Sequence, residues 1–327
     1  MQPLVSVIIL SWNGTKHIFK CLEHIKNQNY TNIEVIIIDN NSTDGSIQKI
    51  TSLYPNYKYI FNLANKGYAA GMNQGLLISK GEFVIPLNQD VCLEYNFINA
   101  CVSRIQKDEN IGAIGGRVYA WIDDQLTNSL RKGEGEHTSW KKRFQGKGGL
   151  VLGDEEAFVF QPSGSLPFCR KEMFLDLKEH TCDFYDEDFE TGWEDADLFF
   201  RMHLRGWKCL FYPIAKGWHV GSGSVGGKAT FLTKKYDYQI RILRNRYFTI
   251  IKNIPTHFLI YLSPYLIFTE LCLIPYFFFR SPKTIFALIL SWKLTIRKFS
   301  SLYNKRIIIE NNSKVKKWYF KKYFTSF

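Results

Sequence analysis

Hydrophobic and polar positions divide residues 1–91 into two alternating kinds of segment. Apolar runs of strand length occupy 4–12, 32–40, 57–63 and 82–91, and the first two are rich in β-branched residues. Between the first two, residues 15–27 carry apolar positions at helical spacing, and the glycine-rich stretch 64–81 opens another helix. Continuous apolar strands that alternate with helices are typical of a parallel sheet covered on both faces. The pattern therefore predicts an α/β fold with ligand chemistry at the carboxyl ends of the strands.

The middle of the chain has a different pattern. Residues 122–156 are glycine-rich and charged, and we expect a long mobile loop there. Residues 160–174 predict a turn that enters a helix. A second helix is predicted from Trp193 to Arg205 with Gly206 as its C-cap, and a short strand follows that ends at Pro213.

Beyond about residue 228 the chain becomes aromatic and basic. Residues 257–279 and 284–292 are very apolar and have basic flanks. The first stretch is long enough to span a membrane, but Pro264, Glu270 and Pro275 argue against a plain transmembrane helix. In-plane membrane contact, insertion and ordinary packing all stay open. The boundary predicts a catalytic domain at 1–227 and a basic C-terminal region at 228–327, which we expect to form membrane-associated helices.

The charge distribution supports this division. Of the 327 residues, 1–227 contain 23 Lys or Arg against 27 Asp or Glu, whereas 228–327 contain 19 against 3. Basic residues interleaved with long apolar runs fit an anionic membrane surface better than a nucleic acid. The seven cysteines are scattered, without a CxxC pair, which favours a reduced compartment over a disulfide framework or a zinc knuckle.

Polar residues at predicted strand ends are the first candidates for chemistry. Asp39 ends a buried strand, where its carboxylate can accept hydrogen bonds from a base or a ribose. The GxGxxG motif of dehydrogenases does not follow the first strand. Asn88 and Asp90 end the fourth apolar run. Because residues two apart on an extended segment point the same way, their oxygens can converge on Mg²⁺ or Mn²⁺.

Three carboxylates gather behind Trp193, where a helix is predicted to begin. Glu194, Asp197 and Arg201 share one helix face, so that Asp197 and Arg201 can form an ion pair. Glu194 and Asp197 can also act only as helix N-terminal acids. Asp195 points about 100° away from its neighbours and can face the crevice.

Seven motifs in order resemble those of the family 2 inverting glycosyltransferases, and within them the rhamnosyltransferase-like and galactofuranosyltransferase-like enzymes of bacterial surface polysaccharide synthesis. The resemblance covers residues 4–224 and implies a GT-A fold, which is a Rossmann-like, mostly parallel sheet. It also implies a nucleotide-sugar donor and a divalent cation, Mg²⁺ or Mn²⁺. The motifs are VSVIILSWNG, IIIDNNSTDGS, NKGYAAGMNQG, PLNQDV, SGSLPFCRKEMF, WEDADLFFR and GWHVGSGS.

Carried over by position, the resemblance assigns roles to individual residues. Asp195 would be the general base, supported by Trp193, Glu194 and Asp197. Asp90 and His219 would hold the metal, with Asn88 replacing the first acid of a DxD motif. The remaining donor-pocket residues would be Asn13, Asp39, Asn65, Gly67 and Asn73.

We therefore expect a metal-dependent inverting glycosyltransferase at the cytoplasmic face of the bacterial inner membrane, peripheral or monotopic. It would move one sugar, from a dTDP-rhamnose-like or UDP-sugar donor, to a glycan or polyprenyl-linked acceptor. A processive synthase is the first alternative, but its QxxRW motif is missing and 239–247 reads QIRILRNRY. A non-catalytic sugar-binding protein is the second, and it would predict loss of Asp90, Asp195 or His219.

Overall fold

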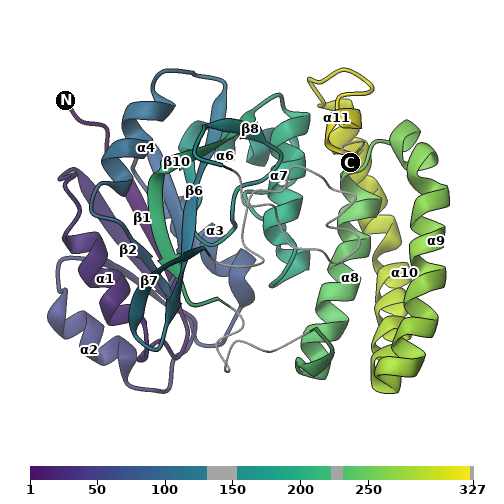
Figure 1. Cartoon of the computed structure of the whole chain (residues 1–327), viewed down its shortest axis with the longest axis horizontal. Helices are drawn as coiled ribbons and strands as arrows, with labels where there is room; N and C mark the ends of the chain where they lie inside the picture. Colours follow the sequence, from purple (N-terminus) through teal and green to yellow (C-terminus); the bar gives the residue numbers. More distant parts are fainter. Residues whose placement is uncertain (131–152, 222–230, 325–327) are drawn as a thin grey trace.

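The first half of the computed structural model alternates strands and helices, as the apolar pattern predicts (Figure 1). The structure describes residues 1–130, 153–221 and 231–324. The elements up to residue 105 are β1 (Val5–Ser11), α1 (Ile18–Lys26), β2 (Ile33–Asp39), α2 (Ser46–Leu53), β3 (Lys58–Phe61), α3 (Gly67–Ile78), β4 (Phe83–Asn88), β5 (Val91–Leu93) and α4 (Phe97–Ile105).

Further strands, of which β6 and β10 are long, and two further helices complete this part of the fold. They are β6 (Ile111–Ile122), β7 (Gln125–Leu130), β8 (Ala157–Val159), β9 (Phe168–Arg170), α6 (Lys171–His180), α7 (Glu194–Leu204) and β10 (Lys208–His219). A 3₁₀ turn, η1 (Glu187–Phe189), precedes α7.

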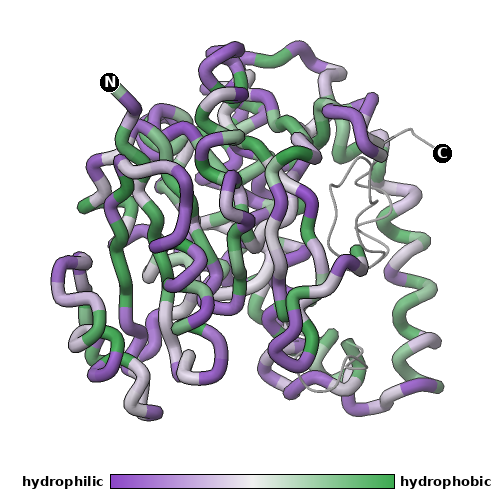
Figure 2. The backbone as a smooth tube through the Cα atoms, turned by 60° about the vertical axis from the view of Figure 1, so that its left-hand side comes forward, coloured by the Kyte–Doolittle hydropathy of each residue, from purple (hydrophilic) through white to green (hydrophobic). Residues whose placement is uncertain are grey.

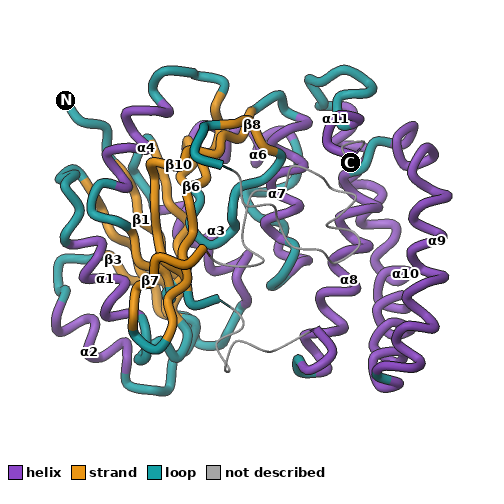
Figure 3. Tube along the Cα trace, in the orientation of Figure 1, coloured by secondary structure: helices purple, strands orange, loops and turns teal. Residues whose placement is uncertain are grey.

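These strands form one ten-stranded sheet in the order β3-β2-β1-β4-β9-β6-β10-β5, with β7 beside β6 and β8 beside β10. β1 pairs in parallel with β2 and β4, and β2 with β3. Alternate residues of the buried strands enter two cores. One lies under α1, α2 and α4, and the other under α3, α6 and α7. The helices cover both faces (Figure 3), and the strands are hydrophobic between hydrophilic ends (Figure 2).

Two predictions about this region are wrong. The mobile loop expected at 122–156 includes β7, which forms an antiparallel hairpin with β6, and β8 begins at Ala157. The central part of that prediction, 131–152, lies outside the described residues. Pro213 does not end its strand either, because β10 runs on to His219. The β6–β10 register shifts between Phe211 and Lys216, so Pro213 lies where no ladder hydrogen bond is needed.

The C-terminal region is helical, as predicted. It consists of α8 (Tyr236–Asn253), α9 (Thr256–Arg280), α10 (Pro282–Asn311) and α11 (Lys321–Phe324), with a short 3₁₀ turn at Phe231–Thr233. α8 and α10 pack side by side, and α9 lies on the far side of α10 from the sheet (Figure 1).

Buried ion pairs join α8 to the α/β part of the fold. The Nζ atom of Lys252 lies 2.6 Å from Asp186 Oδ2 and 2.5 Å from Asp197 Oδ1, and all three side chains are buried. Asp197 also accepts a 2.9 Å hydrogen bond from Arg201 Nε, which confirms the predicted ion pair. The α/β part and the C-terminal helices therefore share one charge network.

α9 is the one helix in the described part of the chain that is long and apolar enough to cross a membrane, and 17% of its most apolar window is buried. Pro264 and Pro275 lie inside it. Glu270 turns towards α8, where its carboxylate pairs with Arg246 and accepts a hydrogen bond from the Tyr247 hydroxyl. The acid therefore faces the helical layer, while much of the apolar surface of α9 is exposed.

Candidate active site

The carboxyl ends of the parallel strands bring two of the predicted residues to one edge of the sheet. In the β1–β2 pairing Asp39 lies opposite Ser11, and in the β1–β4 pairing Asn88 lies opposite Leu10. Parallel register places all three strand ends at the same edge, which is where open α/β sheets bind ligands.

The loops that follow β1 and β2 hold each other through side-chain hydrogen bonds. The Asp39 carboxylate, 5% exposed, accepts from the Ser42 backbone N–H at 3.1 Å. Asn13 has a left-handed backbone (φ 48°), donates its N–H to Ser42 Oγ at 3.0 Å and accepts from the Thr43 N–H at 2.8 Å. Asn13 and Asp39 therefore lie in two adjacent loops, after β1 and after β2, that hydrogen bonds hold together.

Asn65 precedes α3, Gly67 begins it and Asn73 lies in its middle. Gly67 and Asn73 contact the segment before α7. Asn65 Oδ1 accepts from the Gly67 N–H at 2.9 Å. Gly67 has φ +81°, and a Cβ there would lie 3.0 Å from Glu190 O. Asn73, 4% exposed, donates to Tyr185 O and accepts from the Tyr185 N–H, both at 2.9 Å. Its amide holds the segment that leads to α7, and its predicted donor contact stays a prediction.

Asp90 and His219 come together although they are far apart in the sequence. β5 pairs antiparallel with β10, and the Val220 N–H donates to the Asp90 carbonyl. This pairing places His219 Nε2 3.3 Å from Asp90 Oδ1. Burial raises the pKa of Asp90, but the His219 charge and hydrogen bond outweigh it, so that the pKa is lower than usual.

The strand argument for Asn88 and Asp90 is wrong in one respect. β4 ends at Asn88 and residues 89–90 form a turn, so the two side chains are not two apart on one extended segment. Asp90 is aligned through β10 instead, which the local spacing does not reveal.

The donor set at this edge fits a divalent cation. A carboxylate oxygen and an imidazole nitrogen suit Mn²⁺, and Mg²⁺ sites use one or two carboxylates with water and substrate phosphates. The described residues contain no cluster of three or more His, Cys, Asp or Glu side chains that would close such a site.

Asp195 lies in the first turn of α7 and is held from two sides. Gly192 (φ +89°) and Trp193 (φ 70°) set the entry to the helix. Asp195 Oδ2 accepts a 2.7 Å hydrogen bond from Gln161 Nε2. A Cβ on Gly164 would lie 2.6 Å from the same oxygen.

The segment 161–166 connects this carboxylate to the end of β4. Gln161 and Gly164 contact Asp195, while the Ser165 carbonyl accepts a 3.4 Å hydrogen bond from the Asn88 N–H. The sequence motif SGSLPFC points to this segment, but no signal in it identifies Gln161 as the partner of Asp195. The structure adds Gln161 and Gly164 to the candidate site.

The other residues behind Trp193 face the protein interior. Asp197 is fully buried and accepts from Asn253 Nδ2 at 2.8 Å, and Glu194 is 9% exposed. The Trp193 side chain packs against two hydrophobic clusters. Asp197 therefore serves the contact with α8, whereas Asp195, two residues earlier, contacts the 161–166 segment.

Residues 6–166 match the family model described as Glycosyl transferase family 2. The chain is 33% identical over 118 residues to glycosyltransferase GlyG of Streptococcus pneumoniae serotype 4, covering 35% of this chain and 39% of that protein. It is 29% identical over 263 residues to a beta-monoglucosyldiacylglycerol synthase of Nostoc sp., covering 75% and 52%. The matches span about half of these relatives or less.

Two solved structures share the fold at low sequence identity. GalNAc-T7 with UDP, GalNAc and Mn²⁺ superposes with a TM-score of 0.67 at 16% identity, covering 98% of this chain and 56% of that one. The mannosyltransferase PcManGT of Pyrobaculum calidifontis with GDP-Man and Mn²⁺ gives 0.54 at 17%, covering 95% and 87%. These likenesses confirm the predicted GT-A fold.

Proposed function

We propose that this chain, whose residues 6–166 match the model of Glycosyl transferase family 2, transfers one sugar from a nucleoside-diphosphate sugar to an acceptor hydroxyl, with inversion at the anomeric carbon. The observation that carries this proposal is the 161–166 segment, which contacts Asp195 and hydrogen-bonds to the strand end beside Asp90. A base and a diphosphate-binding edge are thereby held in one rigid frame.

Asp195 acts as the general base. Inverting displacement needs a proton acceptor for the attacking hydroxyl on the face opposite the leaving group. Gln161 donates to Oδ2 and the Ala196 N–H donates to Oδ1 at 2.7 Å, so the carboxylate is oriented before the acceptor arrives. No covalent intermediate is required, and a nucleophilic Ser or Cys has no part in the reaction.

Asp90 and His219 hold the divalent cation, with Asn88 beside them. When bound, the cation neutralises the charge of the leaving diphosphate. Asp39 and Asn13 contact the nucleotide from the paired loops after β2 and β1, and Asn65 and Gly67 line the same edge. Both solved structures contain a nucleotide or nucleotide sugar together with Mn²⁺, which supports this donor class. Within it, dTDP-rhamnose-like and UDP-sugar donors are the expected choices.

The acceptor is a glycan or polyprenyl-linked molecule at the cytoplasmic face of the bacterial inner membrane. Exposed apolar side chains run along α9 and α10, among them Ile267, Phe268, Leu271 and Phe286. With the basic charge of residues 228–327, this surface is suited to peripheral or monotopic contact with anionic lipids. One relative is a synthase of a glucosyl lipid, which supports a role in surface glycolipid or polysaccharide synthesis.

The experiment that tests the function is a donor screen. Purified protein is incubated with a panel of nucleotide sugars and Mn²⁺ or Mg²⁺, and release of the nucleoside diphosphate is measured. One donor class should be hydrolysed in a metal-dependent way. A lack of turnover with every donor and acceptor, despite tight sugar binding, would support the non-catalytic alternative. Addition of many sugars to each acceptor molecule would support a processive synthase.

A further inference from the structure

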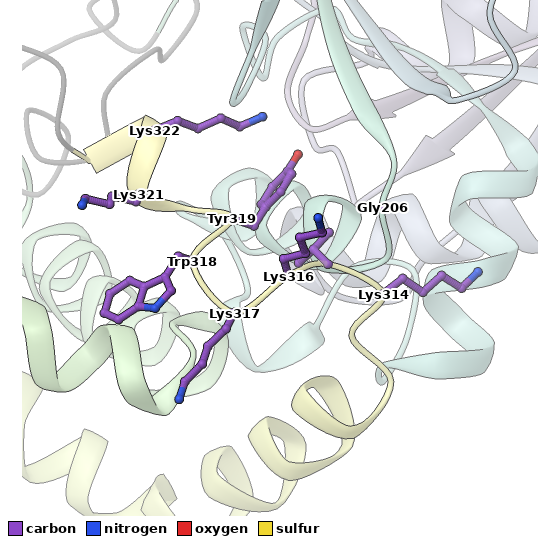
Figure 4. A pocket seen from close by; sticks show the side chains of 9 residues that line it. Gly206, Lys314, Lys316, Lys317, Trp318, Tyr319, Lys321 and Lys322 are labelled. Carbon is purple, nitrogen blue, oxygen red and sulfur yellow. The ribbon is translucent and has the colours of Figure 1, made fainter.

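A hollow lies at the C-terminal end of the chain, beside Gly206, whereas Asp195 lies in the first turn of α7, at the other end of that helix. Its volume is about 1000 Å³, and it is lined by Gly206 and the segment 314–322. Five of the lining residues are lysines and none is acidic (Figure 4). The Nζ atom of Lys314 lies 3.9 Å from Oδ1 of Asp176, which is not part of the lining. The hollow therefore has a single sign of charge.

The backbone of this lysine segment is fixed to α7. Phe320 is 2% exposed and packs against Phe160 and Phe200. The Tyr319 hydroxyl lies 2.9 Å from His203 Nδ1, and the Lys314 N–H donates to the Leu204 carbonyl at 2.8 Å. Since Phe320 points inward and the Tyr319 hydroxyl is held at His203, the lysines are held outward around the hollow.

The lysine segment also borders the apolar helix α9. The Trp318 ring, 49% exposed, lies 5.2 Å from the His257 ring and 6.0 Å from the Tyr261 ring, both in the first turns of α9. Tryptophan, tyrosine and lysine beside a lipid-facing helix are typical of the headgroup layer of a membrane. Lys322 adds to the positive charge of the hollow, although burial and the nearby Lys208 charge lower the pKa of Lys322.

We propose that the lysine segment 314–322 binds the phosphate groups of anionic phospholipid headgroups. The inference deepens the proposed membrane contact of α9 and α10 by locating its electrostatic part. The apolar face of α9 enters the lipid surface, and the lysines around Trp318 contact the headgroups at the amino-terminal end of this helix. The same lysine segment is anchored on α7, whose first turn carries Asp195, so lipid binding fixes the orientation of the site.

The test compares two full-length variants with equal loss of charge. In the first, Lys316, Lys317, Lys321 and Lys322 are replaced by Gln. In the matched control, the exposed lysines of the catalytic domain Lys26, Lys49, Lys80 and Lys107 are replaced by Gln. Cosedimentation is measured with vesicles of phosphatidylcholine alone and of phosphatidylcholine mixed with phosphatidylglycerol.

We expect the first variant to bind the phosphatidylglycerol vesicles at least about tenfold more weakly than wild type, since each lysine near such a surface contributes about fivefold. The control should stay within about twofold. Equal loss in both variants, or loss in neither, contradicts the proposal. Tighter lysine-dependent binding to an RNA or DNA oligonucleotide than to the vesicles also overturns it.

Donor hydrolysis without vesicles separates this inference from the proposed function. The first variant should hydrolyse a soluble nucleotide sugar at the wild-type rate. Lysine-dependent vesicle binding by a protein that hydrolyses no donor would refute the proposed activity alone. Normal hydrolysis with vesicle binding that does not depend on these lysines would refute the lipid site alone.

Discussion

Gln161 donates a hydrogen bond of 2.7 Å from Nε2 to Oδ2 of Asp195. The same carboxylate oxygen lies close to Gly164. A Cβ atom on residue 164 would be only 2.6 Å from it. The Gln161 side chain thus orients Asp195, and the missing side chain of Gly164 leaves space for the Asp195 carboxylate. If Asp195 is the base, Gln161 and Gly164 determine the orientation of its carboxylate, and substitutions at residue 161 or 164 should change the rate of transfer.

Asp195→Asn should reduce sugar transfer by about 10²–10⁴-fold while donor affinity is almost unchanged. An amide keeps the shape and the contact with Gln161 but cannot accept the proton of the acceptor hydroxyl. Initial rates give the loss of activity, and calorimetry gives the affinity for the nucleoside diphosphate. Asp183→Asn serves as the control. Wild-type turnover by Asp195→Asn would refute the assignment of the base.

Gly164→Ala should lower kcat by about tenfold without a change in donor affinity, because a misplaced catalytic group loses rate rather than binding. The added methyl group would lie 3.2 Å from both Cβ and Cγ of Asp195, so the carboxylate must shift. Gly153→Ala is the matched control, since a Cβ there meets no atom within 4 Å. The idea fails if the two variants have the same kcat.

His219→Ala should raise the Mn²⁺ concentration needed for half-maximal binding by about tenfold or more. One of the two protein ligands is removed, and even indirect partners of a metal typically contribute about 10–100-fold. Mn²⁺ binding with a bound nucleoside diphosphate is followed by electron paramagnetic resonance, which does not depend on turnover. His180→Ala, on α6, is the control. An unchanged metal titration would remove His219 from the site.

The sequence predicts the parts of the fold that rest on long apolar runs. β1, β2 and β4 are recognisable because most of their positions are buried, and their ends place Asp39 and Asn88. β5, β8 and β9 have three residues each, too few for a periodic pattern. They form because longer neighbours offer them hydrogen-bonding edges.

The missed parts of the site depend on contacts between segments distant in sequence. Gln161 reaches Asp195 because the 161–166 segment packs against α7, and Asp90 reaches His219 through the β5–β10 pairing. No local sequence pattern predicts the contact between Gln161 and Asp195 or the contact between Asp90 and His219. The resemblance to a family names Asp90, Asp195 and His219, and the geometry adds which neighbours hold them.

Lys252→Met should destabilise the protein by about 3–5 kcal/mol, because two buried carboxylates, Asp186 and Asp197, lose a shared cation. The pKa of Asp186 is lower than usual although burial raises it, since Lys252 and Lys305 overcome the burial. The free energy of unfolding in urea measures the effect. The control Lys298→Met removes a half-exposed pair with Asp188 and should cost at most about 1 kcal/mol. Equal decreases in the free energy of unfolding for Lys252→Met and Lys298→Met would contradict a stabilising role of the buried ion pairs.

His203 makes the stability of the fold depend on pH. The ring is fully buried, with Nε2 2.7 Å from the Phe160 carbonyl and Nδ1 2.9 Å from the Tyr319 hydroxyl. The carbonyl can only accept, so Nε2 carries the proton and Nδ1 accepts from tyrosine. Burial lowers the pKa of His203 to about 3, although the hydrogen bond to Phe160 opposes the shift.

A histidine of this kind is neutral in the folded state and binds a proton on unfolding once the pH is below about 6.5. Its contribution is therefore complete above that pH and is lost as the pH falls towards 3, at about 1.4 kcal/mol per pH unit. In urea titrations between about pH 6.5 and 5, before most carboxylates titrate, His203→Gln should show a flatter pH dependence than wild type. His180→Gln should keep the wild-type slope. Parallel slopes for wild type and His203→Gln would show that His203 is not held neutral, because glutamine cannot take up the proton.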